Sequence, residues 1–178
     1  MESLWPDSGM RAASNSLRGA LHASRRILAP DPKLGPRYLA SQDETLVLCP
    51  EGRLWVDVEA FEEASAMTRR SQHPAAYLAA SQLYTGELLP EDRYEDWMEN
   101  RREGLRRLYL ELLVEVTGLY KERQDYGQAI ETIHRILSEE PNNEEAHADL
   151  MRLYAISGRQ GEALTHYDRL REIFRTAW

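Results

Sequence analysis

The chain has 178 residues, 42% hydrophobic and 29% charged, which is typical of one ordinary domain or two small ones. Its single cysteine, Cys49, excludes an internal disulfide framework and indicates a reducing, cytoplasmic setting. The sequence contains no apolar run long enough for a membrane span and no signal peptide at its start, so we expect no membrane association. The net charge of -8 is uneven, because residues 1–37 carry six basic and three acidic side chains while residues 59–178 carry 15 basic and 23 acidic ones. An acidic C-terminal part with a basic N-terminal part indicates that the two parts have different functions.

Residues 10–29 are predicted to form one amphipathic helix, because apolar side chains recur at three- and four-residue steps. The face expected to be buried carries Ala13, Leu17, Ala20, Leu21, Ser24, Ile27 and Leu28. The opposite face carries Arg11, Asn15, Arg18, His22 and Arg25. This second face has no acid, and arginine and asparagine are the side chains that reach base edges, so it is a candidate DNA contact. The alternative is an ordinary solvated face, although such faces usually mix both signs of charge.

Residues 37–57 change to the two-residue period of strands. Candidate strands lie at 37–41, at 45–49, which is rich in β-formers, and at 54–57, and a turn is expected at 50–53. We expect the last two strands to form a hairpin. A helix followed by a small hairpin is typical of the second half of a winged-helix module.

From Asp57, a candidate N-cap, the sequence predicts only helices. We expect them at about 58–71, 74–87, 92–123, 126–139, 143–157 and 160–175. The last four contain one helical hairpin written twice.

A spacing of 34 residues relates the two copies, since it separates Tyr120 from Tyr154 and Ala129 from Ala163. That period, with an aromatic on each first helix and a small residue on each second one, is typical of tetratricopeptide (TPR) repeats. Gly158 is expected at the turn inside the second copy, where a residue that accepts a positive φ is needed. Such repeats bury their apolar faces only by stacking on neighbours, so the rest of the chain should cap them.

Catalytic chemistry finds no support in the sequence. The five histidines lack zinc-ligand spacing with the one cysteine, and no glycine-rich phosphate loop occurs. We therefore expect no catalytic residue, no metal site and no cofactor, and histidines of the repeats in surface or packing roles. Acidic residues between the two copies could accept a cation, but helix-end charges around a solvated loop are the better interpretation of Glu139, Glu140, Glu144 and Glu145.

A family resemblance rests on four stretches in a fixed order. They are Leu4-Trp5-Pro6-Asp7, then Asn15-Ser16-Leu17-Arg18, then residues 54–61, and finally residues 84–90 followed by Trp97, Arg101 and Arg102. The series resembles the bacterial transcriptional activator domain family, as found in antibiotic-regulatory-protein-type (SARP-type) regulators. The resemblance covers nearly the whole chain.

The resemblance implies a mainly α fold in two parts. Residues 1–57 would be a partial OmpR-type winged-helix DNA-binding region, with its recognition helix at about 10–29 and its wing at about 45–57. Residues 58–178 would be a TPR-like helical activator domain that binds a protein partner or a second copy of the chain. Residues implied to face promoter DNA are Arg11, Asn15, Arg18, His22 and Arg25, with Arg26 and Arg37 as phosphate candidates.

Two functions remain open at this point. The family's winged helix normally has strands and a first helix before the Leu-Trp-Pro-Asp turn, and here the chain begins three residues before that turn. We expect either a fragment of a longer regulator or a half module whose exposed apolar face invites homodimerisation or partner docking. The first function is transcriptional regulation with DNA contact through helix 10–29. The second is a TPR-type interaction adaptor without DNA binding, which the missing half module and the net charge of -8 favour.

Overall fold

The computed structural model describes residues 9–29, 31, 33–42, 45–52, 54–92 and 96–176. The described chain is mainly helical, with eight α-helices and one small antiparallel sheet. It separates into two compact units, residues 1–55 and 56–178. The turn predicted at residues 4–7 and Tyr94 of the predicted long helix lie outside the described residues.

The first unit contains α1 (Met10–Leu28), α2 (Gly35–Tyr38), β1 (Leu39–Gln42) and β2 (Thr45–Leu48). α1 agrees with the predicted helix to within one residue at its C-terminal end. α2 packs on α1 and on β1, and Gly35 makes the approach to α1 possible. A Cβ built on Gly35 would lie 3.0 Å from the Cβ of Arg25, so a larger residue would push the two helices apart.

The hairpin of this unit differs from the predicted one. β1 pairs with β2 in antiparallel register, Leu39 opposite Leu48 and Gln42 opposite Thr45, whereas the described residues 54–56 form no strand. The predicted pairing of the strands at 45–49 and 54–57 is therefore wrong, and the hairpin spans residues 39–48. After β2, Cys49 adopts a φ of 47° and Pro50 has no N–H to donate to a further strand.

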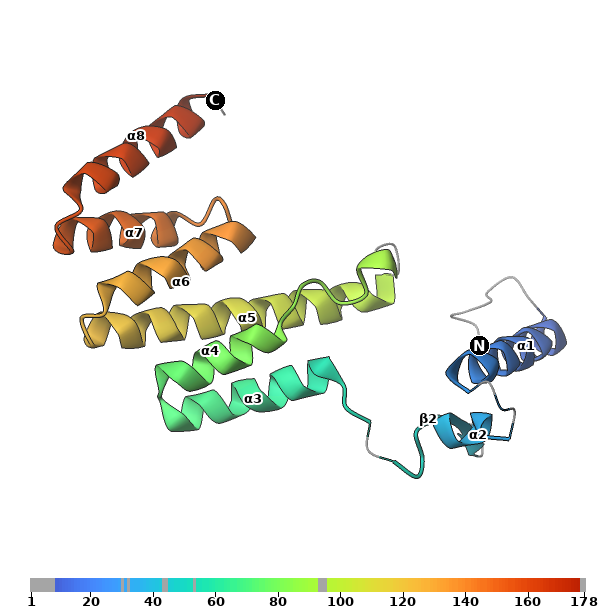
Figure 1. The fold of residues 1–178 in the computed structure, drawn as a ribbon. Coiled ribbons are helices and arrows are strands. Elements are labelled where there is room, and N and C mark those ends of the chain that lie inside the picture. The colour runs from blue at the N-terminus through green and yellow to red at the C-terminus, as the bar shows by residue number, and fades with distance from the viewer. Residues whose placement is uncertain are drawn as a thin grey trace. The chain divides into compact units, whose positions relative to one another are not determined.

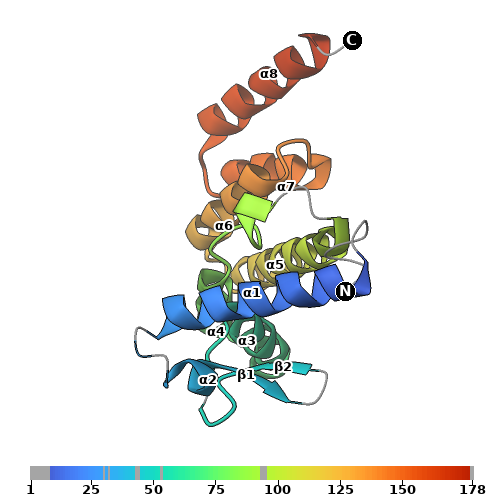
Figure 2. The same ribbon diagram turned by 90° about the vertical axis from the view of Figure 1, so that its right-hand side faces the viewer.

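The second unit is a stack of consecutive antiparallel helices, in which each helix packs on the next one along the chain (Figure 1). The helices are α3 (Asp57–Ser71), α4 (Pro74–Leu83), α5 (Asp96–Glu122), α6 (Tyr126–Glu139), α7 (Glu144–Ile156) and α8 (Gln160–Thr176), with a short 3-10 helix at Pro90–Asp92. α8 diverges from α7 with distance from their connecting turn (Figures 1 and 2).

Local signals explain where these helices begin and end. The Asp125 and Asn143 side chains accept the backbone N–H groups of Gln128 at 3.2 Å and Ala146 at 2.9 Å, which caps α6 and α7. Gly158 has a φ of 78°, which confirms the positive φ expected at that turn. α4 ends at Leu83 rather than at 87, because residues 84–89 form an irregular loop with Gly86 at a φ of 146°.

One hydrophobic core runs through the second unit. It contains Phe61 and Tyr77 at one end and Leu150 and Tyr154 at the other. Tyr120 and Tyr154, which are 34 residues apart, are both buried, as is Ala129, while its counterpart Ala163 is only partly buried. The residues on which the sequence period rests are thus packing residues.

Candidate functional site

The predicted DNA-facing side chains lie along α1, in the first unit. Arg11, Asn15, Arg18 and His22 are all exposed, and their spacing of four, three and four residues places them on one side of the helix. Within the described part of the chain, none of these four side chains has a hydrogen bond or an ion pair. This face of α1 therefore presents two guanidinium groups, an amide and an imidazole to the surroundings.

Arg25 is placed differently from the four residues before it. Its Nε donates a hydrogen bond to the backbone oxygen of Leu39 at 2.8 Å, and its stem packs on Gly35. The side chain is partly buried and fixes α1 against the start of the hairpin. The structure thus gives Arg25 a positioning contact that helical spacing alone did not reveal.

The two phosphate candidates are both exposed. Arg26 lies in the last turn of α1, where a cation also suits the helix dipole. Arg37 lies on α2, and its Nε is 3.6 Å from a carboxylate oxygen of Glu51. Because both partners of that ion pair are largely exposed, it restrains Arg37 only weakly.

In the second unit, a shallow groove lies between α5, α6 and α7. It has a volume of about 240 Å³, and its lining includes Val114, Gly118 and Ile136. Val114 is 58% exposed, whereas Lys121 and Asp149 form an ion pair of 2.7 Å in the same groove. An apolar strip beside a paired charge is a surface that a peptide or a helix could contact.

Two arginines of the second unit, the buried Arg102 and the partly buried Arg135, have structural roles that the sequence did not predict. Arg102 donates hydrogen bonds to the backbone oxygens of Leu88 at 2.9 Å and Leu89 at 3.1 Å, which holds the loop after α4 against α5. Arg135 of α6 donates to the hydroxyls of Ser81 and Tyr109, both at 3.1 Å. Helical periodicity does not identify these arginines. In the sequence alone, an arginine that packs in the interior looks the same as one that faces solvent.

Three tyrosines of the second unit have shifted pKa values because they are packed against other side chains. Burial raises the pKa values of Tyr77, Tyr84 and Tyr120 above the ordinary tyrosine value. Among the described residues, no group of three or more His, Cys, Asp and Glu side chains is arranged to hold a metal ion. In the same residues, no helix is both long and apolar enough to cross a membrane.

These features define a mainly helical chain with an exposed basic helix in one unit and a stack of helices in the other. The family model described as "Bacterial transcriptional activator domain" matches residues 56–177, which is more than half of the chain and nearly the whole second unit. The chain belongs to the bacterial transcriptional activator domain family, as its resemblance indicated. This family is a regulatory one and not a family of enzymes. No curated protein and no solved structure matches the chain.

Proposed function

We propose that the protein is a transcriptional regulator, or the C-terminal part of one, that contacts DNA through α1 and acts in the cytoplasm. The observation that carries the proposal is the exposed face of Arg11, Asn15, Arg18 and His22, which has no acid and no internal partner among the described residues. Membership of an activator-type family supports the same reading.

The mechanism follows from the chemistry of that face. Arg11 and Arg18 would neutralise phosphates and reach base edges, and Asn15 between them can make a two-pronged contact to adenine. Arg25 would act by holding α1 on the hairpin, because its Nε already donates to Leu39. The hairpin at 39–48 would take the role of the wing in a partial winged helix, with Arg26 and Arg37 as phosphate contacts.

The second unit would bind protein. We propose that residues 58–178 form a TPR-like domain, in which α5 with α6 and α7 with α8 are the two copies of the repeat. The 34-residue spacing of Tyr120 and Tyr154, both buried, supports this assignment. The groove between α5, α6 and α7 is the surface that we expect a partner protein or a second copy to use.

A protein-interaction adaptor is the second candidate function. The net charge of -8 repels DNA as a whole-molecule field, and Arg25 and Arg37 already have partners within the protein. In this case the first unit would not contact nucleic acid, and the groove between α5, α6 and α7 would be the surface that binds the protein partner.

The test is fluorescence anisotropy of the whole chain with labelled 30-base-pair duplexes of mixed sequence, across a series of salt concentrations. We expect binding that weakens as salt rises, with a log–log slope of about -3 for three to four phosphate contacts. The double substitution Arg11→Glu with Arg18→Glu should weaken binding at least about tenfold and flatten the slope.

The matched control makes the same change of net charge in the second unit. Arg152→Glu with Arg171→Glu reverses two side chains that are 63% and 59% exposed on α7 and α8. If both doubles weaken binding equally, the contact is a general field effect and α1 has no special role. If the unmodified chain does not bind at low salt, the adaptor function replaces the proposal.

A further inference from the structure

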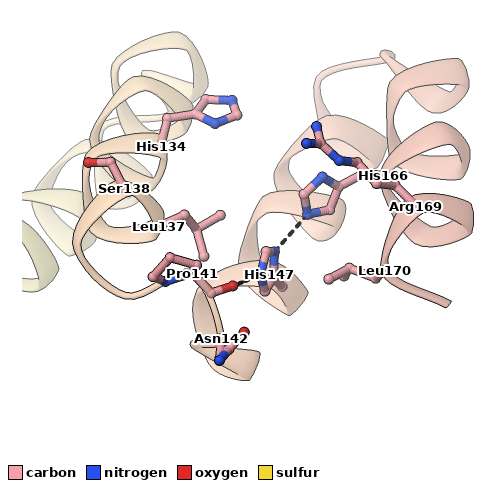
Figure 3. A pocket seen from close by; sticks show the side chains of 9 residues that line it. All are labelled: His134, Leu137, Ser138, Pro141, Asn142, His147, His166, Arg169 and Leu170. Atoms are coloured by element: carbon pink, nitrogen blue, oxygen red, sulfur yellow. Dashed lines mark hydrogen bonds between the residues drawn. The ribbon is translucent and has the colours of Figure 1, made fainter. Parts of the chain in front are cut away.

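A pocket of about 530 Å³ lies where α6, the turn after it, α7 and α8 meet (Figure 3). Figure 3 shows His134 of α6 and His166 and Arg169 of α8 on opposite sides of this space, with His147 of α7 below them. All four side chains line the pocket. The pocket is thus built from parts of the chain that come together only when α8 folds back beside α6 and α7.

The hydrogen bonds of the pocket fix the protons of two histidines. His147 Nε2 is 2.8 Å from the backbone oxygen of Pro141, and that oxygen can only accept, so His147 Nε2 carries a proton. His147 Nδ1 is 2.9 Å from His166 Nε2. In the neutral pair, His147 Nδ1 accepts and His166 Nε2 donates. If His166 takes up one proton, its Nε2 still donates to His147 Nδ1 and the bond is kept. A second proton on His147 Nδ1 would place two N–H groups against each other and break it.

The charge of the pocket is of one sign. Its lining has three histidines and Arg169 and no carboxylate. Burial, then His147, His134 and Arg169, lower the pKa of His166, so the groups that face it from α6, α7 and its own helix are basic. Within the described residues, the Arg169 guanidinium has no ion-pair or hydrogen-bond partner. The protein as a whole has a net charge of -8, so a basic cavity differs from the rest of its surface. Solubility alone does not explain this local basic charge.

The pocket also has apolar walls. Leu137 of α6 and Leu170 of α8 line it together with Pro141 of the turn, and Ser138 adds a hydroxyl at the exposed end of α6. Pockets of several hundred Å³ with mostly apolar walls and a few convergent polar groups are the usual form of small-molecule sites. Convergent cationic donors select the anionic end of such a molecule.

We propose that this pocket binds a small organic anion, a molecule with a carboxylate or phosphate group on an apolar body. The anionic group would lie between Arg169, His166 and His134, whose Nε2 is 3.0 Å from the Tyr154 hydroxyl, and the apolar body against Leu137 and Leu170. Because the ligand contacts α6 and α8 together, its binding fixes the last helix of the stack. The inference concerns the second unit alone, so it stands independently of DNA contact by α1.

The proton state of the histidine pair makes binding depend on pH. An anion favours the protonated form of the pair, because a positive charge beside it is stabilised. Binding must therefore take up a proton wherever the free pair is neutral. Because the pKa of His166 in the free pocket lies below its ordinary value of about 6.5, we expect affinity to rise as the pH falls toward and below that value.

The experiment is isothermal titration of the whole chain with phenyl phosphate, benzoate, benzyl alcohol and inorganic phosphate. We expect saturable binding of one or both aromatic anions, at least about tenfold weaker binding of inorganic phosphate, and none of the neutral alcohol. The ratio between phenyl phosphate and benzoate distinguishes the two anionic groups. Histidine Hε1 resonances should shift for His134, His147 and His166, while His22 and His73 serve as internal references.

Two variants locate the site and one controls for charge. Arg169→Gln removes the free guanidinium and should weaken binding about tenfold, as expected for loss of a charge-assisted hydrogen bond. Ser138→Glu places a carboxylate in the pocket and should abolish binding. Arg171→Gln removes the same charge two residues away, at a side chain that pairs with Asp168 at 3.4 Å, and should leave affinity unchanged.

The proposal is overturned by any of three results. They are no saturable binding of either aromatic anion at millimolar concentration, equal weakening by Arg169→Gln and Arg171→Gln, and shifts of all five histidines together. Ser138 and Arg169 are exposed, so both variants are expected to fold, and circular dichroism of each variant checks this.

Discussion

Arg102 illustrates how a single buried charge organises the second unit. Its side chain is only 5% exposed, and it donates to the carbonyl oxygens of Leu88 and Leu89 while Glu87 and Glu99 lie 3.9 Å away. These carbonyls belong to an irregular loop and have no helix or strand to satisfy them. The guanidinium N–H groups donate hydrogen bonds to these carbonyls, as backbone N–H groups do within helices and strands.

We predict that Arg102→Met lowers the free energy of unfolding by about 3 kcal/mol, because it removes a buried charge that donates to the loop carbonyls of Leu88 and Leu89. Urea unfolding followed by circular dichroism measures the effect. The control is Arg107→Met, since Arg107 is 72% exposed and only 3.9 Å from Glu111, and its loss should change stability by less than about 0.5 kcal/mol. Equal destabilisation by the two substitutions would show that Arg102 has no special role.

At the scale of elements, the turn between α7 and α8 lets the cost of backbone strain be measured without a change in packing. Gly158 has a φ of 78°, and nothing lies within 4 Å of a Cβ built on it. We predict that Gly158→Ala costs about 1 kcal/mol, because the only change is a side chain in a left-handed conformation. Gly161→Ala, in the first turn of α8, should be neutral or stabilising. Urea midpoints of the two variants test this, and a neutral Gly158→Ala would mean that the turn adapts.

The hairpin of the first unit shows where reasoning from periodicity ends at the scale of elements. Residues 54–56 alternate as a strand would, yet they lead straight into α3, and the pairing partner of β2 is β1. Period two predicts that a segment is extended but does not say which neighbour it pairs with. β1 and β2 are separated by fewer residues in the sequence than β2 and residues 54–56, and a shorter separation closes at lower entropic cost.

At the scale of the molecule, the two units differ in how much core they possess. The main hydrophobic core lies wholly within residues 56–178, from Phe61 to Tyr154. In the first unit Ala13, Ala29 and Leu39 are buried, while Ile27 is 83% and Trp55 is 70% exposed. The second unit therefore has the means to fold by itself, and the first has little apolar burial to draw on.

We predict that residues 56–178 expressed alone keep their helical circular dichroism and melt within about 5 °C of the whole chain. The physical reason is that deletion of residues 1–55 removes none of the main core. The whole chain at equal concentration is the control. A fragment that loses its helical signal, or melts without cooperativity, would mean that the first unit completes the core of the second.

The sequence by itself determined the helical class of the protein, α1, the approximate places of the helices from 57 onward, the turn at Gly158 and the family. The helices and the turn follow from local periodicity, turn chemistry and the 34-residue spacing, and the family follows from the resemblance of four short stretches. Only the tertiary structure decided that Arg25 binds Leu39, that Arg102 holds a loop, that β1 pairs with β2, and that three histidines and Arg169 meet in one pocket. These contacts join residues from different elements, and the helical period that places each residue on its own face does not say which other face it will meet.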